Sequence, residues 1–222
     1  MSQAIKICGL STAPALAAAL EAGADMVGFV FFDKSPRCVT YEQARALAAR
    51  ARQRAEIVAL CVDATDEALQ KIVAATEPDY LQLHGQETPE RVAQIQRKFG
   101  VSAIKAIGVA DISDFSRAQE YRDAADALLI DAKPPKGAIL PGGNGLPFDW
   151  RLAKNFHPRK PWLLSGGLDA GNVAQAIALS RTRGVDVSSG VESAPGVKDI
   201  EKIKAFIAAA RAAFDADVER AS

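Results

Sequence analysis

Short apolar runs alternate along the chain with longer segments of helical character. The runs are rich in Val, Ile, Leu and Phe, and the segments between them are rich in Ala, Glu and Arg, which is the pattern of β/α units. Eight runs are predicted to be strands, at residues 4–8, 26–32, 57–62, 80–84, 103–107, 127–131, 162–166 and 185–189. Since each is followed by a predicted helix, the strands should be parallel with right-handed crossovers. The pattern predicts an α/β fold, a (β/α)8 TIM barrel, as a single domain over residues 1–222.

Residues with capping chemistry stand where the predicted helices should begin. They are Ser11 or Thr12, Thr40, Thr88, and Asp169 or Asn172. An open doubly wound sheet is the alternative to the barrel. That fold would be favoured by a G-x-G-x-x-G sequence after the first strand, where this chain has Cys8, Gly9 and Leu10.

The charge balance and the apolar runs of the sequence limit the kinds of binding partner that are expected. Lys and Arg together number 27, and Asp and Glu also number 27, so no overall positive charge predicts binding of nucleic acid or of a membrane surface. No apolar run approaches the roughly 18 residues of a membrane span, and no export signal is visible, which predicts a cytoplasmic protein. A small molecule is the expected partner, and a monomer is expected, with a homodimer as the alternative.

Cysteine and histidine patterns predict neither disulfides nor a zinc site. The three cysteines, Cys8, Cys38 and Cys61, are irregularly spaced and are expected to be free thiols. Two histidines without a CxxC or HExxH pattern make a dedicated zinc site improbable, although a magnesium ion bound by carboxylates would escape such a scan. No metal is predicted.

The connection over residues 132–147 is longer than the roughly 2 to 6 residues usual between a strand and its helix. It contains Gly142, Gly143, Asn144 and Gly145, which favour a loop that closes over a ligand. A variable surface insertion is the alternative interpretation.

Two glycine-containing turns follow the last two predicted strands, where barrel enzymes commonly bind phosphate. Backbone N–H groups free of bulky side chains, aided by a short helix beginning near Gly190, suit an anion. Either turn alone is more often just a tight turn, but two adjacent turns at this location favour a phosphate site. The predicted phosphate-binding residues are Gly166, Gly167, Ser188, Ser189 and Gly190.

Cys8 and Asp131 end the first and sixth predicted strands, so in a barrel they face the same mouth from different sides. Strand alternation puts Lys6 on the face of Cys8, and Leu129 on that of Asp131, toward the interior. The two residues could therefore act as an acid and a base. The competing interpretations are an inert packed thiol and a structural carboxylate.

The same alternation turns Gln82, His84 and Asp186 inward near the mouth, where hydrogen bonds within the rim are the alternative to substrate contacts. Arg37, after the second strand, could bind a carboxylate through its guanidinium fork, whereas a solvated loop arginine is the alternative.

The chain resembles a known enzyme family at several motifs spread over its whole length. They are KICGL from Lys6, GFVFFDKSPR from Gly28, QLHG from Gln82, LLIDA from Leu128, SGGL from Ser165 and DVSSGVE from Asp186. With these motifs in order, the chain resembles phosphoribosylanthranilate isomerase. The resemblance implies a (β/α)8 barrel that acts in tryptophan biosynthesis without a cofactor. It implies an Amadori rearrangement of N-(5-phosphoribosyl)anthranilate to 1-(2-carboxyphenylamino)-1-deoxyribulose 5-phosphate.

The resemblance also implies roles for the matching residues. Cys8 would be the general base, and Asp131 would be a general acid that stays protonated near neutral pH. A reactive thiolate implies electropositive surroundings for Cys8, with the substrate's iminium as a contributor. Arg37 would meet the anthranilate carboxylate, the two glycine turns would hold the 5-phosphate, and Asp186 would touch the bridging amine. Asn144 departs from the small hydroxyl residue of many relatives.

Three other functions remain open at this point. One is a related isomerase of histidine biosynthesis, which has an aspartate where Cys8 stands. Another is indole-glycerol-phosphate synthase, which uses a lysine acid, and Lys6 and Lys105 leave it possible. The third is a phosphate-binding barrel without catalysis, in which Cys8 and Asp131 are merely packed.

Overall fold

Eight parallel strands close into a barrel in the computed structural model, which describes residues 3–133, 140, 142 and 148–221. Every strand pairs with its neighbours in sequence, and β8 closes on β1 with Ile5 opposite Val185. The strands are β1 (Ala4–Cys8), β2 (Met26–Phe31), β3 (Glu56–Cys61), β4 (Tyr80–Leu83), β5 (Ser102–Val109), β6 (Ala127–Ala132), β7 (Trp162–Leu164) and β8 (Gly184–Val187). The predicted barrel is confirmed, and the open sheet is excluded.

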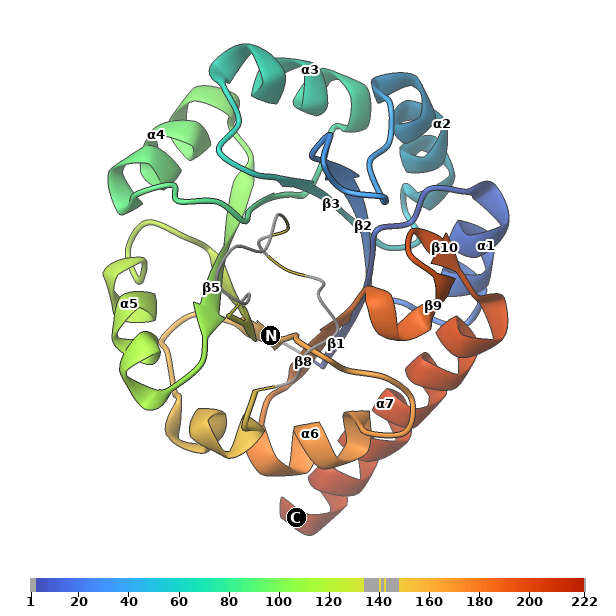
Figure 1. Cartoon of the computed structure of the whole chain (residues 1–222), viewed down its shortest axis with the longest axis vertical. Helices are drawn as coiled ribbons and strands as arrows, with labels where there is room; N and C mark the ends of the chain where they lie inside the picture. Colours follow the sequence, from blue (N-terminus) through green and yellow to red (C-terminus); the bar gives the residue numbers. More distant parts are fainter. Residues whose placement is uncertain (1–2, 134–139, 141, 143–147, 222) are drawn as a thin grey trace.

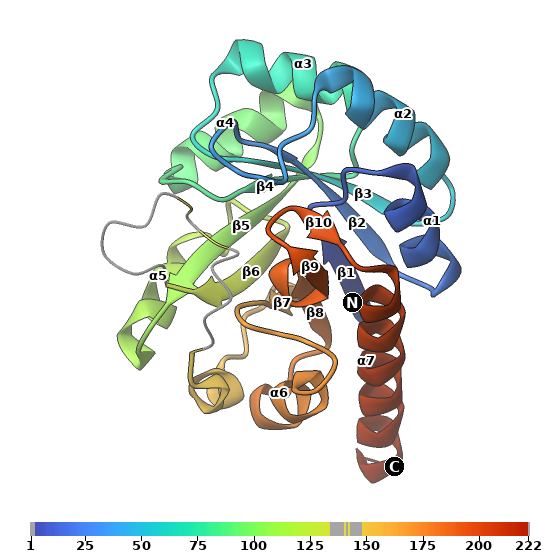
Figure 2. The ribbon, with the colours of Figure 1, turned by 45° about the vertical axis from the view of Figure 1, so that its right-hand side comes forward.

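Helices surround this barrel on the outside (Figure 1). They are α1 (Ala13–Glu21), α2 (Tyr41–Ala51), α3 (Asp66–Thr76), α4 (Pro89–Phe99), α5 (Phe115–Glu120), α6 (Val173–Ser180) and α7 (Ile200–Ala221). The long helix α7 runs down the side of the barrel beside α1 (Figure 2). No helix among the described residues is long and apolar enough to cross a membrane.

The predicted capping residues stand at the helix starts. The hydroxyls of Thr12, Thr40 and Thr88 each accept a hydrogen bond from a backbone N–H in the first turn of α1, α2 and α4. Before α6, the side chain of Asp169 accepts bonds from the N–H groups of Gly171 and Asn172. The threonine bonds fix where α1, α2 and α4 begin, whereas the Asp169 bonds lie in the loop before α6, whose N-cap residue Asn172 has no side-chain cap bond.

The helix predicted after β6 is a 3-10 helix, η2 (Trp150–Asn155), rather than an α-helix. Its backbone hydrogen bonds join residues three apart, from the N–H of Leu152 to the carbonyl of Asp149 and from the N–H of Phe156 to the carbonyl of Ala153. A short 3-10 helix, η1 (Ile112–Asp114), also precedes α5.

The chain after β8 is more elaborate than predicted. The expected short helix near Gly190 is a single 3-10 turn, η3 (Ser189–Val191). A small antiparallel pair, β9 (Glu192–Ala194) and β10 (Val197–Lys198), then precedes α7. This pair lies beside the mouth of the barrel (Figure 2).

Alternation along the strands separates two kinds of core, as predicted. Ile5, Ile7, Leu128 and Ile130 are buried in the clusters that strands form with the helices. The barrel interior is filled by a separate cluster of Ala4, Met26, Val58, Ile104, Ala106, Ala127, Leu129 and Leu163. Residues at the next inward positions therefore face the mouth.

At the opposite end of the barrel, three aspartates bind strand backbones. Asp25, Asp79 and Asp126 precede β2, β4 and β6, and each carboxylate accepts a hydrogen bond from a backbone N–H of the preceding strand. The distances are 2.7 Å to Ile5, 2.7 Å to Ile57 and 2.9 Å to Ala103. These aspartates satisfy donors at the strand starts.

Candidate active site

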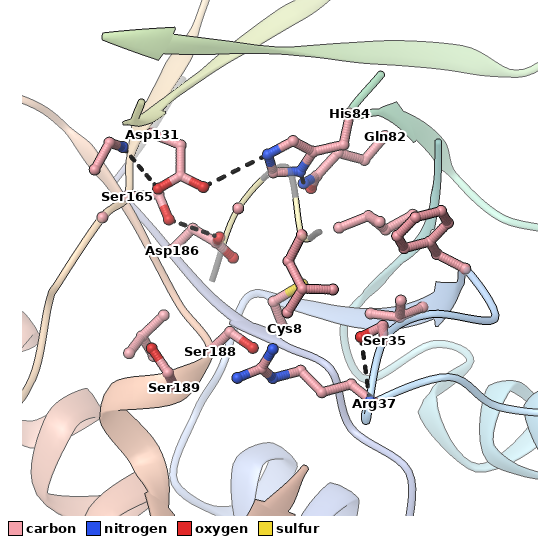
Figure 3. Close-up of a pocket in the computed structure, with 18 of the residues that line it drawn as sticks. Cys8, Ser35, Arg37, Gln82, His84, Asp131, Ser165, Asp186, Ser188 and Ser189 are labelled. Carbon is pink, nitrogen blue, oxygen red and sulfur yellow. Dashed lines mark hydrogen bonds and ion pairs between the residues drawn. The ribbon is translucent and has the colours of Figure 1, made fainter. Parts of the chain in front are cut away.

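A pocket opens at the carboxyl ends of the barrel strands, the end where barrel enzymes carry their sites (Figure 3). Of the predicted site residues, the pocket is lined by Cys8, Arg37, Gln82, His84, Asp131, Gly166, Gly167, Asp186, Ser188 and Ser189. Gly190 does not line it. Residues from six strands or the loops after them are thus brought to one cavity, although they are spread from position 8 to position 189.

Cys8 is the last residue of β1 and is buried apart from its side toward the pocket. Burial raises the pKa of the Cys8 thiol, the ammonium of Lys6 lowers it, the charge of Asp186 raises it, and Lys198 lowers it. The balance is a pKa above the ordinary value. Two ammonium groups lower the pKa of the thiol, but they do not outweigh its burial, so the lowered pKa that a reactive thiolate implies is not found in the protein without substrate.

Asp131 on β6 is connected to His84 and, through it, to Gln82 (Figure 3). One carboxylate oxygen accepts a 2.8 Å hydrogen bond from the N–H of Ala132, and the other lies 3.5 Å from His84 Nε2. His84 Nδ1 is 3.1 Å from Gln82 Nε2. Gln82 is fully buried, and its Oε1 has no partner among the described residues. The chain of contacts holds the Asp131 carboxyl against the pocket wall.

Asp186 on β8 is held by two buried groups. Its Oδ1 accepts a 2.7 Å ion-paired hydrogen bond from Lys6 Nζ, and its Oδ2 accepts a 3.2 Å bond from the Ser165 hydroxyl. Sequence reasoning placed Asp186 at the mouth and Lys6 on the face of Cys8, but it did not pair them. Their pairing joins β1 to β8 directly beneath the pocket.

Arg37 is buried and forms a two-point ion pair that sequence reasoning missed. Its Nε and Nη2 donate to the two carboxylate oxygens of Glu192, at 2.7 and 2.9 Å. Glu192 also accepts a 2.8 Å bond from Lys198 Nζ. Burial raises the pKa of Glu192, but hydrogen bonds and charge from Arg37 and Lys198 outweigh it, so this pKa is lowered. Glu192 closes the DVSSGVE motif and was the available signal.

The two glycine turns meet where they were predicted to. Gly166 and Gly167 both have positive φ, at 88° and 66°, and line the pocket opposite Ser188 and Ser189. A Cβ on Gly166 would lie 2.7 Å from the backbone nitrogen of Ala132, so a larger residue cannot fit there.

Gly190 has a packing role. A Cβ there would collide with the carbonyl of Leu168, which explains the glycine without a ligand.

One wall of the pocket is apolar. It consists of Val30 and Phe32 from β2 and its loop, and of Leu60 and Val62 from β3 and its loop. Cys8, Val30 and Leu60 pack together as a small buried cluster, with Phe32 and Val62 against it. An apolar wall of this kind suits a flat apolar ring.

The predicted lid is described only at four positions. Ala132, Lys133, Leu140 and Gly142 all line the pocket. A Cβ on Gly142 would lie within 2.8 Å of His84, and it would collide with the Asp131 carboxylate. Asn144 and the rest of the Gly-rich cluster lie outside the described residues, so closure of this loop stays a prediction.

Neither lysine considered as a catalytic acid lines the pocket. Lys105 points away from the barrel interior, and its ammonium donates to the carbonyls of Leu83 and Gly85 and to Glu87. Lys6 is fully buried in its pair with Asp186. Within the described part of the chain, no three His, Cys, Asp or Glu side chains gather as a metal site would require.

Comparison with known proteins gives one consistent result. Residues 5–209 match the family model described as N-(5'-phosphoribosyl)anthranilate (PRA) isomerase. The chain is 56% identical over 213 residues to the N-(5'-phosphoribosyl)anthranilate isomerase of Nitrobacter winogradskyi, covering 96% of this chain and 95% of that protein. It is 54% identical to the protein of that name from Rhodopseudomonas palustris, covering 96% and 97%.

Solved structures agree with the sequence comparison. The crystal structure of phosphoribosyl anthranilate isomerase from Thermotoga maritima is 36% identical, with a TM-score of 0.85, covering 96% of this chain and all of that one. A phosphoribosyl anthranilate isomerase in complex with reduced 1-(o-carboxyphenylamino)-1-deoxyribulose 5-phosphate is similar at 35% identity and a TM-score of 0.82, covering 96% of this chain and all of that one.

Proposed function

Because the chain belongs to the N-(5'-phosphoribosyl)anthranilate isomerase family of tryptophan biosynthesis, we propose that it catalyses the Amadori rearrangement with Cys8 as general base and Asp131 as general acid. The substrate is N-(5-phosphoribosyl)anthranilate, and the product is 1-(2-carboxyphenylamino)-1-deoxyribulose 5-phosphate. The two are isomers, so the reaction consumes no external oxidant or reductant. A cofactor is not required by this chemistry.

One observation carries the proposal. Cys8 and Asp131, from β1 and β6, line the same pocket together with a guanidinium and two glycine turns. An acid and a base on different strands can act on different atoms of one bound ligand. A phosphate-binding barrel without catalysis would need only the glycine turns.

The reaction begins with ring opening. Asp131 protonates the ribose ring oxygen, the bond from that oxygen to C1 breaks, and the bridging nitrogen forms an iminium with C1. The Cys8 thiolate then removes the C2 proton, and the electron pair of that bond forms an enolamine. The enolamine becomes the ketone when its hydroxyl proton is lost and C1 gains a proton. Transfer of a proton from Cys8 to Asp131 restores the starting state.

The charge of the intermediate favours proton removal when it is needed. The Cys8 thiol has a raised pKa in the free protein. The iminium places a positive charge one bond from the C2 atom that Cys8 attacks, which stabilises a nearby thiolate. The reactive thiolate form of Cys8 would thus be most populated after the ring has opened.

Arg37 and the apolar wall suit the anthranilate group. Glu192 occupies Nε and Nη2 of Arg37, and among the described residues no hydrogen bond engages Nη1, which is therefore available to the substrate carboxylate. Val30, Phe32, Leu60 and Val62 would pack on the aromatic ring.

The remaining pocket residues would bind the sugar. Gly166, Gly167, Ser188 and Ser189 would hold the 5-phosphate through backbone N–H groups. Asp186 would contact the bridging amine. Gln82 and His84 were predicted to touch substrate, and their mutual bond and the proximity of His84 to Asp131 favour orienting the acid as their main role.

The test is turnover by the purified chain. N-(5-phosphoribosyl)anthranilate should be consumed, with loss of its anthranilate-type fluorescence. The reduced product analogue should inhibit competitively, because it would occupy the same pocket. An absence of turnover, in protein that binds the analogue, would overturn the proposed activity in favour of a non-catalytic binding role.

A further inference from the structure

Lys6 is a fully buried lysine to which the proposed reaction gives no task. It lies on β1 two residues before Cys8, so both side chains project from the same face of the strand into the barrel. Its ammonium donates to Asp186 across a 2.7 Å ion pair inside the barrel. Buried ion pairs contribute little net stability, because removing both charges from water offsets their attraction. Packing alone is a weak reason for a lysine at this position.

The neighbouring strand leaves room for Lys6 to approach Cys8. Gly28 on β2 stands beside Cys8 in the register of the barrel. A Cβ at Gly28 would lie 3.1 Å from Cys8 Sγ and 3.4 Å from Lys6 Nζ. The thiol and the ammonium therefore border the same small space, and the glycine places no side chain between them.

We propose that Lys6 is a positioning residue for the reaction: its ammonium, held in place by Asp186, stabilises the thiolate of Cys8 when that thiolate acts as the base. This inference rests on the proposed function, because it assumes that Cys8 removes the C2 proton. It explains why a charged pair lies directly below the mouth, where apolar residues fill the layer beneath.

The charges around Cys8 are of both signs. Lys6 and Lys198 lower the pKa of the thiol, whereas burial, which is the largest influence, and Asp186 raise it. Asp131, His84 and Arg37 line other walls of the same pocket. Lys6 is the positive group that shares a strand face with the thiol, so its removal should have the clearest effect.

Lys6 keeps its own charge in spite of burial. Burial lowers the pKa of its ammonium, but the charge of Asp186, the charge of Cys8 and hydrogen bonds with both outweigh that effect, and the pKa is raised. A lysine that stays charged can exert a constant field on Cys8 over the working pH range. Asp186 thus acts on the thiol indirectly, by keeping Lys6 protonated.

The chain offers a matched control in Lys105. This lysine is also buried and also paired with a carboxylate, Glu87, at 2.8 Å. It lies on the outer face of β5 and does not line the pocket. Lys105→Met should therefore disturb folding to a comparable degree without affecting the thiolate of Cys8.

The experiment measures the reactivity of Cys8 directly. Iodoacetamide alkylation of the peptide that contains Cys8 is followed by mass spectrometry as a function of pH, in the wild type and in Lys6→Met, Lys6→Gln, Lys6→Arg and Lys105→Met. Lys6→Gln keeps a donor for Asp186, so it carries the test if Lys6→Met does not fold. Melting temperatures of all variants report on stability.

The expected result separates charge from structure. At about pH 8, alkylation of Cys8 should slow roughly tenfold or more in Lys6→Met and Lys6→Gln, since one pKa unit changes the thiolate fraction about tenfold. Lys6→Arg and Lys105→Met should stay within about threefold of the wild type. In Lys6→Met and Lys6→Gln, the acid limb of the pH profile of kcat/KM should shift to higher pH. The fall in kcat should be larger than the change in KM.

Two outcomes would overturn the inference. One is a Lys6→Gln profile that overlays the wild type, and the other is an equal shift in Lys105→Met. Failure of the proposed function is seen elsewhere, as turnover retained by a Cys8→Ala variant. Alkylation reports on the thiol whether or not Cys8 is the catalytic base, so the two failures can be told apart.

Discussion

The two ends of the barrel use the same side chain for different purposes. At the amino ends of the strands, Asp25, Asp79 and Asp126 bind backbone N–H groups and lie outside the pocket. At the carboxyl ends, Asp131 and Asp186 line the pocket, within reach of a ligand. Position in the barrel, rather than residue type, thus separates carboxylates that support the fold from carboxylates available for chemistry.

Strand β6 allows the sharpest test of this difference, because Asp126 precedes it and Asp131 lies near its carboxyl end. Asp131→Asn removes the acid without changing the size of the side chain, so kcat should fall by about a hundred- to ten-thousandfold. Asp126→Asn should leave kcat unchanged. Steady-state turnover of both variants would measure the effect. Equal kcat values in the two variants would contradict the assignment of chemistry to the carboxyl end alone.

A smaller effect is expected for the arginines at the two ends. Arg37→Ala should raise KM about tenfold to a hundredfold, since a charged hydrogen bond to the substrate carboxylate contributes about 1.5–3 kcal/mol. The matched control is Arg211→Ala, because Arg211 pairs with Asp25 away from the pocket. Its KM should equal that of the wild type. An unchanged KM in Arg37→Ala would remove the carboxylate-binding role.

The amino end should show the reverse pattern, with stability affected and activity preserved. Asp79→Ala leaves the backbone N–H of Ile57 without its 2.7 Å partner, which should lower the free energy of unfolding by about 1–2 kcal/mol. Urea unfolding would measure the loss, and kcat should not change. A fall in kcat with unaltered stability would contradict the assignment of this end to the fold.

The smallest effect concerns the pH dependence of stability. Glu192 has a folded-state pKa below its ordinary value of 4.5, so its ion pairs stabilise the protein above pH 4.5 and lose this effect as the pH falls through the lowered pKa. In Glu192→Gln that loss should be absent, making the acid limb shallower by at most about 1.4 kcal/mol per pH unit. The free energy of unfolding of both proteins would be measured at several acidic pH values. Curves that fall with the same slope in the wild type and the variant would contradict the prediction.

The barrel and most of the pocket were predictable from sequence, because strand alternation has a period of two residues. Once Cys8 and Asp131 are placed at strand ends, their inward direction follows. The pairing of Arg37 with Glu192 was not predictable in this way, since the partners are 155 residues apart and meet only through the loops after β2 and β8. Long-range ion pairs leave no periodic pattern.

Local departures from the β/α repeat were also not predictable from the sequence. A 3-10 helix stands after β6 where a regular β/α pattern would supply an α-helix, and the β9–β10 pair is added between β8 and α7. Gly190 was interpreted as part of a phosphate site, whereas its contact with the Leu168 carbonyl is sufficient to require a glycine. Whether a position requires glycine for packing or for ligand binding depends on its neighbours in space, which the sequence alone does not give.

The most direct test of the central claim is a paired measurement on Cys8→Ala. Binding of the reduced product analogue and turnover of N-(5-phosphoribosyl)anthranilate are measured on the same sample. The account predicts binding within about threefold of the wild type, because the remaining pocket is intact, and a loss of kcat of about a hundredfold or more, because no base reaches C2. Turnover near the wild-type rate with normal binding would contradict the assignment of Cys8 as the base.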